Sequence, residues 1–311
     1  MNILVVGGAG YIGGAVTDLL MKTSHTVRVY DALLYEEHYR KPIDFMRADI
    51  RDRVKLAKQL QWSDAVIWLA ALVADGSCAL YPELAVEFNQ TSVGWLAEHF
   101  DGRIIFPSTC LMYAIKNGVL DEDSAKDPSS IYTKTKFIAE EYLKDKNALI
   151  VRLSTVFGVG DSFSRPRLDL VVNLLTARAL MEKRMIVFGG EQSRPFVHVR
   201  DVAQVMVDNV DTKPTGIFNL HAENMKIIEL SKKIQAHIPD ATIEIKEAAL
   251  TDTGDYRMGS EKARSVLGFK PSRTVEDGIK EIQAFILEGR LKDIRNPRYS
   301  NEAFLKANPI I

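Results

Sequence analysis

The chain has 311 residues, of which 46% are hydrophobic and 26% are charged, a composition typical of a globular protein with one large domain or two. Forty basic and 41 acidic residues leave a net charge of −1, so bulk charge gives no reason to bind nucleic acid or an anionic membrane. No apolar run reaches about 18 residues and no basic leader precedes the first apolar segment, so we expect a cytoplasmic protein without membrane insertion. Two cysteines, Cys78 and Cys110, and six scattered histidines show no metal-ligand spacing, and we expect no metal.

The first apolar run, Ile3–Val6, leads into the glycine-rich segment Gly7-Gly8-Ala9-Gly10-Tyr11-Ile12-Gly13-Gly14. A helical pattern follows, which predicts a buried strand, a tight turn and then a helix. The free N–H groups and the positive dipole end of such a helix favour a pyrophosphate. Gly8-x-Gly10-x-x-Gly13 fits the dinucleotide-binding fingerprint and Gly7-x-x-Gly10-x-x-Gly13 fits its wider variant, although a glycine-rich turn without a ligand has the same pattern.

The second expected strand, Thr26–Tyr30, ends at Asp31, 18 residues after Gly13. An acidic side chain at about this distance accepts hydrogen bonds from the ribose hydroxyls of an adenosine and repels a 2′-phosphate. A plain turn residue at a strand end is the alternative, but strand, glycine turn, helix, strand and acid follow in order. The segment therefore predicts a site for NAD rather than NADP.

Short apolar runs then alternate with helical patterns. We expect strands at residues 45–48, 65–69, 103–106 and 148–153, and helices at 53–60, 83–100 and 130–144. This alternation predicts an α/β fold of the Rossmann type, a doubly wound parallel sheet with helices on both faces. Ligands bind beyond the carboxyl ends of such strands, where Gly10, Asp31, Ala70 and Ser108 are expected.

The alternation loosens after Gly158. We expect helices at 168–183, 201–209 and 227–237, and strands at 185–188 and 217–219. We predict an NAD-binding Rossmann domain at 1–160, to which later segments return, and a smaller substrate-binding α/β region with the C-terminal tail at 161–311. The tail from Arg295, which has two prolines and few apolar residues, is expected to be a surface extension.

Tyr132 and Lys136 stand four residues apart at the start of an expected helix and therefore share one face. A lysine ammonium there stabilises a tyrosinate, lowers the phenol pKa and can bind the nicotinamide ribose. The spacing alone is usually structural, but this helix follows a strand that ends in Pro107-Ser108-Thr109, whose hydroxyls are placed to share a substrate proton with Tyr132. We interpret these residues as a catalytic group.

With these motifs the chain resembles the extended short-chain dehydrogenase/reductases, and among them the nucleotide-sugar epimerases and dehydratases. The resemblance covers most of the chain. The matching segments are residues 7–13, 49–52, 69–71, 89, 108–113, 132–136, 152–158, 188–190, 194–203 and 262–271.

The resemblance implies that Thr109 is the catalytic hydroxyl, Tyr132 the base and Lys136 the lysine that tunes it. The cofactor-binding positions predicted from the fingerprint or implied by the resemblance are Gly7, Gly10, Tyr11, Ile12, Gly13, Asp31, Asp49, Ile50, Leu69, Ala70, Ala71, Asn89, Tyr132 and Lys136. The expected substrate-binding positions are Ser108, Thr109, Tyr132, Arg194 and Arg257. The two arginines match residues that bind a substrate diphosphate, for which a guanidinium is suited, and surface ion pairs are their alternative.

Some positions depart from the family pattern. Cys110 and Leu111 stand where dehydratases carry acidic residues, which disfavours 4,6-dehydration, and Thr155 stands in place of a substrate-side asparagine. Some members use a cysteine near this loop as an acid/base, but Cys110 is one position off, so a packed thiol and a substrate contact are its alternatives.

Four further polar residues have two interpretations. Arg165, Arg167, Asp169 and Asn173 either line the nucleotide end of the crevice or lie on the solvated surface.

The resemblance implies an NAD-dependent epimerase of a nucleoside-diphosphate sugar that acts through a transient 4-keto intermediate. An NAD(P)-dependent 4-keto-sugar reductase or dehydrogenase is the alternative. A dinucleotide-binding sensor is more remote, because such relatives typically lose the Tyr/Lys pair that this chain keeps.

The resemblance also implies a homodimer formed through helices 83–100 and 130–145. The apolar side chains of the second helix serve either this interface or packing within the subunit; they are Ile138, Ala139, Tyr142 and Leu143.

Overall fold

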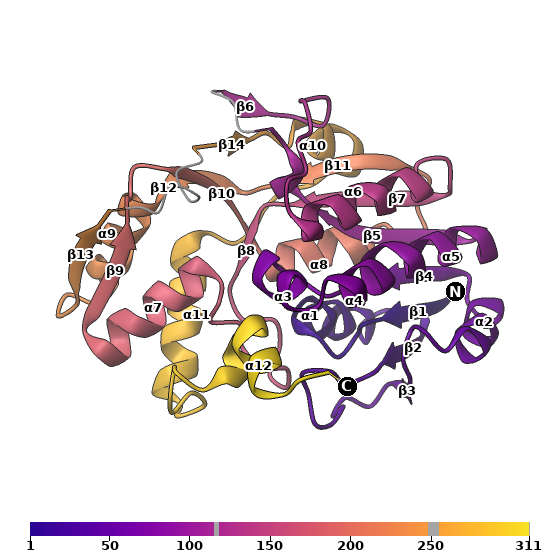
Figure 1. The fold of residues 1–311 in the computed structure, drawn as a ribbon, viewed down its shortest axis with the longest axis horizontal. Helices are drawn as coiled ribbons and strands as arrows, with labels where there is room; N and C mark the ends of the chain where they lie inside the picture. The colour runs from indigo at the N-terminus through magenta and orange to yellow at the C-terminus, as the bar shows by residue number, and fades with distance from the viewer. Residues whose placement is uncertain (115–117, 248–254, 311) are drawn as a thin grey trace.

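The computed structural model describes residues 1–114, 118–247 and 255–310. Its main sheet has seven parallel strands in the order β11-β7-β5-β4-β1-β2-β3 (Figure 1). The strands are β1 (Asn2–Val6), β2 (Thr26–Asp31), β3 (Asp44–Arg47), β4 (Ala65–Trp68), β5 (Arg103–Thr109), β7 (Ala148–Leu153) and β11 (Gly216–Leu220). The order reverses at β1, where the chain turns to the opposite half of the sheet, and the predicted Rossmann-type fold is confirmed.

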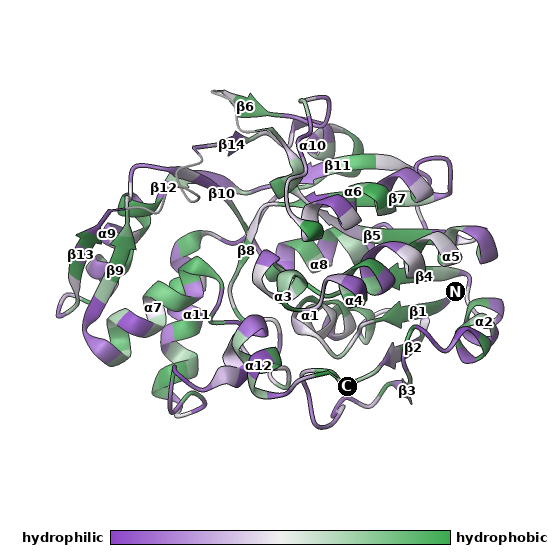
Figure 2. Cartoon of the chain, in the orientation of Figure 1, coloured by the Kyte–Doolittle hydropathy of each residue, from purple (hydrophilic) through white to green (hydrophobic). Residues whose placement is uncertain are grey.

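Helices cover both faces of this sheet. On one face α1 (Tyr11–Leu20) packs beside α8 (Val199–Asp208) over a core that includes Val16, Met206 and Phe218. The other face carries α2 (Arg53–Trp62), α5 (Ser92–His99) and α6 (Ile131–Leu143). Figure 2 shows hydrophobic residues concentrated along the central strands, as expected for a sheet that is buried on both sides.

The long helix expected at residues 83–100 is built from three consecutive pieces. These are α4 (Pro82–Val86), a π-helical turn η1 (Glu87–Thr91) and α5. The π turn inserts one residue into the helical register, and such turns are frequent at functional sites. It contains Asn89, one of the expected cofactor-side positions.

The smaller lobe is assembled from short sheets and three long helices. One sheet joins β8 (Thr155–Phe157), β10 (Ser193–His198) and β12 (Glu223–Lys226), and two further pairs join β9 (Arg184–Phe188) to β13 (Thr242–Lys246) and β6 (Val119–Leu120) to β14 (Arg257–Met258). Its helices are α7 (Val171–Glu182), α9 (Ile227–His237) and α11 (Val275–Leu287), while α10 (Glu261–Leu267) lies beside β11. The segment that forms α8 and β11 returns to the main sheet.

The C-terminal tail is not the surface extension expected from its sequence. After the 3₁₀ turn η4 (Pro297–Tyr299), Ser300 caps a helix, α12 (Asn301–Ala307), through a bond that its hydroxyl accepts from the Ala303 N–H at 3.3 Å. Leu305 on this helix is fully buried in a cluster that includes Cys78, of α3 (Asp75–Leu80), and Tyr132. Figure 1 shows α12 between the main sheet and the smaller lobe. The expectation was wrong because a few apolar side chains suffice to dock a short helix.

None of the helices in the described part of the chain is long and apolar enough to cross a membrane.

Candidate active site

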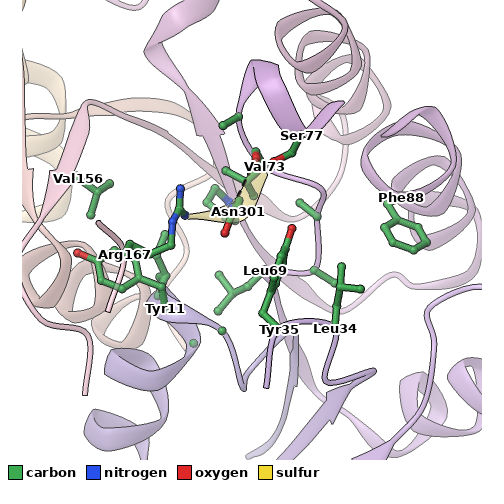
Figure 3. Close-up of a pocket in the computed structure, with 18 of the residues that line it drawn as sticks. Tyr11, Leu34, Tyr35, Leu69, Val73, Ser77, Phe88, Val156, Arg167 and Asn301 are labelled. Atoms are coloured by element: carbon green, nitrogen blue, oxygen red, sulfur yellow. Dashed lines mark hydrogen bonds between the residues drawn. The ribbon is translucent and has the colours of Figure 1, made fainter. Parts of the chain in front are cut away.

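A cavity of about 540 Å³ lies beyond the carboxyl ends of the central strands (Figure 3). Its wall includes the glycine turn before α1, the ends of β2, β4, β5 and β7, the start of α6, the segment 165–170 and the C-terminal residues Ser300, Asn301 and Glu302. The crevice predicted at this edge of the sheet is therefore present, and it is closed on one side by the C-terminal segment.

The glycine turn is packed against the neighbouring backbone. Gly7 has a φ of +86°, and a Cβ on it would lie 2.4 Å from the Ala70 nitrogen. A Cβ on Gly13 would lie 2.6 Å from the Gly7 carbonyl oxygen. These glycines allow α1 to begin directly at the sheet edge, and Gly10 at its N-cap offers no side chain to the first N–H groups. The exposed N–H groups are arranged for an anion.

Asp31 joins this turn to the end of β2. One carboxylate oxygen accepts a hydrogen bond from the Ala9 N–H at 3.0 Å and the other accepts one from the Leu33 N–H at 2.7 Å. Burial raises the pKa of Asp31, and the two N–H donors oppose this effect. Each oxygen keeps further acceptor capacity toward the cavity, as a ribose diol requires.

The other predicted cofactor positions divide into two groups. Asp49, Ile50 and the segment 69–71 line the cavity together with Gly7, Gly10, Tyr11, Ile12 and Gly13. Asn89 does not line it. Its buried amide accepts from the Leu72 N–H at 2.8 Å and donates to the Leu72 carbonyl at 2.8 Å, so it shapes the wall from behind.

Several polar atoms of the wall are buried without a partner among the residues that the structure describes. They are the side-chain oxygens of Tyr35, Ser77, Ser108 and Ser154. Buried hydroxyls are normally hydrogen-bonded, so this group indicates that a polar ligand completes the site. Together with the glycine turn and Asp31, these donors and acceptors fit a dinucleotide.

The predicted catalytic residues meet in the same cavity. Thr109 ends β5, and Tyr132 and Lys136 lie on the first turns of α6, whose start is fixed by a capping box at Ser130. The side chains of these three residues are buried. The Lys136 ammonium donates to the Pro107 carbonyl at 2.9 Å and lies 4.5 Å from the centre of the Phe106 ring. Burial lowers the pKa of Lys136 to about 8.

The pKa of Tyr132 differs from the expectation that was based on its spacing from Lys136. Burial raises the pKa of the Tyr132 phenol, and the Arg167 guanidinium lowers it. The expectation of a lowered phenol pKa did not include the cost of removing a phenolate from water. A cation supplied by a ligand would be needed to bring this pKa down.

The segment before α7 lines the cavity rather than the solvated surface. The Arg167 guanidinium donates to both Asp169 carboxylate oxygens, at 2.6 and 3.0 Å. Arg165 donates to the Arg298 carbonyl at 2.7 Å and to the Asn301 side chain. Asn173 is buried behind them and fixes the backbone of Gly158 and Arg167.

The wall residues of the C-terminal segment were missed by sequence reasoning. The available signal was the N-cap residue Ser300 a few positions before the apolar pair Phe304-Leu305, a helix-start pattern. Pro297 and Pro309, which flank this segment, favoured a surface extension instead.

Arg194 and Arg257 do not line the cavity. Arg194 donates to the Ser193 carbonyl at 3.0 Å, and its guanidinium lies 5.1 Å from the ring centre of Tyr256. Arg257 is exposed at the start of β14. Tyr256 belongs to a buried cluster that also contains Cys110.

Cys110 lines the cavity but is almost fully buried. Burial raises the pKa of its thiol to about 12. The thiolate is therefore disfavoured at neutral pH, which supports the packed-thiol interpretation over an acid/base role.

Residues 3–220 match the model of the NAD dependent epimerase/dehydratase family. The chain belongs to this family. It is 28% identical to a UDP-glucose 4-epimerase of Lactobacillus helveticus, over 90% of this chain and 94% of the relative. The predicted family, enzyme class and NAD cofactor are thereby confirmed.

Solved structures of the family share the fold. A UDP-glucose 4-epimerase of Thermotoga maritima superposes with a TM-score of 0.83 at 24% identity, covering 94% of this chain and all of that one. A UDP-glucuronic acid 4-epimerase of Bacillus cereus superposes with a TM-score of 0.80 at 25% identity, covering 93% and 99% of the two chains.

Proposed function

We propose that the protein is an NAD-dependent epimerase of a nucleoside-diphosphate sugar that acts through a transient 4-keto intermediate. The observation that carries this proposal is the convergence of the glycine turn, Asp31 and the group Thr109, Tyr132 and Lys136 on one cavity. Relatives that span most of the chain and are named UDP-glucose 4-epimerases support this reaction over the other reactions of the family.

Bound NAD supplies reversible hydride transfer, and the chain supplies the proton transfer. Tyr132, as tyrosinate, accepts the proton of the sugar C4 hydroxyl while that carbon is oxidised to the ketone. The Thr109 oxygen accepts a hydrogen bond from the Leu111 N–H at 3.2 Å, so its own proton is directed elsewhere and can orient the substrate oxygen. Lys136 keeps positive charge beside the tyrosinate. The keto sugar then rotates in the site. Its opposite face is reduced while Tyr132 returns the proton to the C4 oxygen.

The C-terminal segment on one side of the cavity supports an epimerase over the alternative dehydrogenase or 4-keto-sugar reductase. An epimerase regenerates its cofactor in every turnover and can retain it, whereas a net oxidoreductase must exchange it. The C-terminal segment spans the cavity from Val73 on the sheet side to Asp169, which accepts a bond from the Asn301 N–H at 2.9 Å. This cover supports a retained dinucleotide.

The test combines cofactor content with product analysis. The purified protein is assayed for bound NAD and incubated without added NAD, first with UDP-glucose and then with UDP-glucuronic acid, and the sugar configuration is followed by NMR. Inversion at C4 with no net reduced nicotinamide is the expected result. Stoichiometric reduction of added NAD would instead establish a dehydrogenase, and binding without turnover of any nucleotide sugar would establish a sensor.

We also propose a homodimer through the outer face of α4, α5 and α6. Ala139 and Leu143 of the expected apolar face are fully buried in the subunit core. This leaves the partly buried Ile138 and Tyr142, at 44% exposure, together with Val86 of α4, at 39% exposure, for a partner. Sedimentation of the wild type and of Tyr142→Glu tests this arrangement. We expect a dimer that the charged variant dissociates.

A further inference from the structure

The β2–β3 segment, residues 32–43, forms part of the cavity wall without helical or strand structure. Residues 32–36 line the cavity, and Figure 3 shows Leu34 and Tyr35 beside it. Leu33 has a φ of +58°, a conformation that a leucine rarely adopts. A segment that belongs to no helix or sheet is held largely by its side chains, so their contacts determine how readily this wall opens.

Lys41 anchors the end of this segment from a buried position. Its side chain is 2% exposed, and its ammonium lies 2.6 Å from an Asp161 carboxylate oxygen and 2.7 Å from one of Asp18. It also donates to the Thr17 hydroxyl at 2.8 Å and to the Gly14 carbonyl at 2.5 Å. A lysine is rarely buried unless it is paired, and here its three N–H donors face four acceptors. The surroundings therefore hold a charged lysine in one position.

Asp161 connects this lysine to the first turn of α1. Burial raises the pKa of Asp161, but the Lys41 ammonium and the Ser164 donors outweigh this effect and hold the pKa below its usual value. A Cβ on Gly14 would lie 2.6 Å from the Asp161 carboxyl carbon, so the ion pair packs directly on α1. Asp161 also accepts a bond from the Ser164 N–H at 2.7 Å. The pair thereby joins the β2–β3 segment to α1 and to residues 161–165.

The cavity-lining half of the β2–β3 segment is held by the same neighbours. The Arg165 N–H donates to the Glu36 carboxylate at 2.7 Å, and the Arg165 guanidinium lies 4.3 Å from the centre of the Tyr35 ring. The Tyr35 ring packs edge-on against Phe304 of α12, with the ring centres 5.4 Å apart. The anchor at Lys41 is thus continuous with the C-terminal wall of the cavity.

We propose that the Lys41–Asp161 ion pair is a clasp that holds the β2–β3 segment beside the glycine turn and thereby slows release of the dinucleotide. Both residues line one small hollow together with Gly8 and Ala9, which places the clasp next to that turn. A ligand under a covering segment is released when the segment opens. Loss of one member of a buried ion pair favours opening, because the other charge would otherwise stay buried without a partner. Lys41 and Asp161 are positioning residues here, since the cavity wall itself is formed by their neighbours.

The test measures how fast labelled NAD leaves the loaded protein during a chase with excess unlabelled NAD. Lys41→Met removes the ammonium but keeps an unbranched side chain, and Lys41→Arg restores a positive charge. Lys22→Met is the matched control, because Lys22 is exposed just after α1. Thermal unfolding of each NAD-free variant verifies that it is folded, and hydrogen exchange of residues 32–43 in the same protein reports opening of the segment.

We expect Lys41→Met to release NAD about 10- to 100-fold faster than the wild type and to exchange faster over residues 32–43, because Asp161 loses its closest cation. Lys41→Arg should recover most of the wild-type rate, and Lys22→Met should match it. Wild-type release from folded Lys41→Met overturns the proposal. A uniform loss of stability without faster exchange over residues 32–43 also overturns it, because the pair would then support the whole fold rather than this segment.

Asp18→Asn provides a second variant that leaves the clasp itself in place. Asp18 is 25% exposed, and its substitution removes one of the two carboxylates that hold Lys41. We expect a smaller acceleration of NAD release than in Lys41→Met. If Lys41→Met does not fold, unchanged release from Asp18→Asn overturns the proposal. No sugar takes part in these measurements, so failure of the clasp and failure of the proposed epimerase reaction give separate results.

Discussion

The two walls of the cavity are built in different ways. The sheet-side wall comes from the ends of neighbouring strands and the turn before α1, and its residues lie in short motifs such as Gly7–Gly13. The opposite wall joins segment 165–169 to the C-terminal segment, and its hydrogen bonds connect Arg165 and Asp169 to Asn301, 136 and 132 residues away.

This difference suggests a division of roles, in which one wall binds the dinucleotide and the other selects the substrate. A dinucleotide needs a backbone turn and a strand-end acid, which a short stretch of chain can encode. The opposite wall has no backbone motif of this kind and uses side chains held by long-range contacts. We therefore expect changes on the sheet side to affect NAD and the chemistry, and changes on the opposite side to affect ligand retention and selectivity.

The largest effect is expected at Tyr132, which packs in one cluster with Leu305 where the two walls meet. Tyr132→Phe removes the base and should lower kcat by about 100- to 10,000-fold while bound NAD stays unchanged. Tyr142→Phe, on the exposed end of the same helix, is the control and should retain full kcat. A kcat of Tyr132→Phe equal to that of the wild type would contradict the proposed mechanism.

Leu305→Ala tests whether the C-terminal wall is an integral part of the structure. This side chain is fully buried, so its truncation should cost about 2–5 kcal/mol of local stability, increase proteolysis of the C-terminal segment and accelerate NAD release. Leu287→Ala is the matched control because Leu287 is 76% exposed. Equal NAD release rates in the two variants would mean that the segment covers the cavity without retaining the cofactor.

Two glycines of the sheet-side wall should respond differently to the same substitution. Gly13→Ala places a Cβ 2.6 Å from the Gly7 carbonyl and should lower the free energy of unfolding by about 1–3 kcal/mol. In Gly10→Ala the Cβ would lie 3.5 Å from the same oxygen, an ordinary contact, so the fold should persist while NAD binds more weakly. Urea unfolding and NAD titration distinguish the two, and equal NAD affinity of Gly10→Ala and wild type would argue against close approach of the pyrophosphate.

A pH dependence of stability is expected to originate at Lys136. Burial lowers its pKa in the folded protein to about 8, compared with about 10.4 in an unfolded chain. Between these values the unfolded chain binds a proton that the folded chain does not, so the free energy of unfolding should gain up to about 1.4 kcal/mol for each pH unit as the pH rises from about 8 to 10. Urea unfolding of Lys136→Met, which lacks this group, should show a correspondingly smaller gain. Parallel pH profiles of the two proteins would mean that Lys136 stays charged in the fold.

Local patterns predicted most of the sheet-side wall. The run Ile3–Val6, the glycines and Asp31 follow one another within a single βαβ unit, and each has a conformational or electrostatic reason to stand at its position. Tyr132 and Lys136 share a helix face for the same local reason. Asn89 was the exception, because its amide faces the backbone of Leu72 and its role depends on the π turn that contains it.

Residues of the opposite wall were not predictable in the same way. Arg165, Arg167 and Asp169 are charged residues without a motif, and whether such side chains face solvent or a cavity depends on the segment that packs over them. That segment follows more than 120 residues later and was expected on the surface. Arg194 and Arg257 show the converse, because residues implied by the resemblance lie outside the cavity wall.

The sequence by itself determined the parallel α/β sheet, the glycine turn followed by an acid at the end of the next strand, and the placement of Tyr132 and Lys136 on one helix, because each depends on periodicity or on groups a few residues apart. Only the tertiary structure decided that the chain end contributes to the cavity wall, that Arg165, Arg167 and Asp169 line the cavity, and that burial raises the pKa of Tyr132. These properties come from contacts between distant segments and from loss of water, and local sequence patterns predict neither of them.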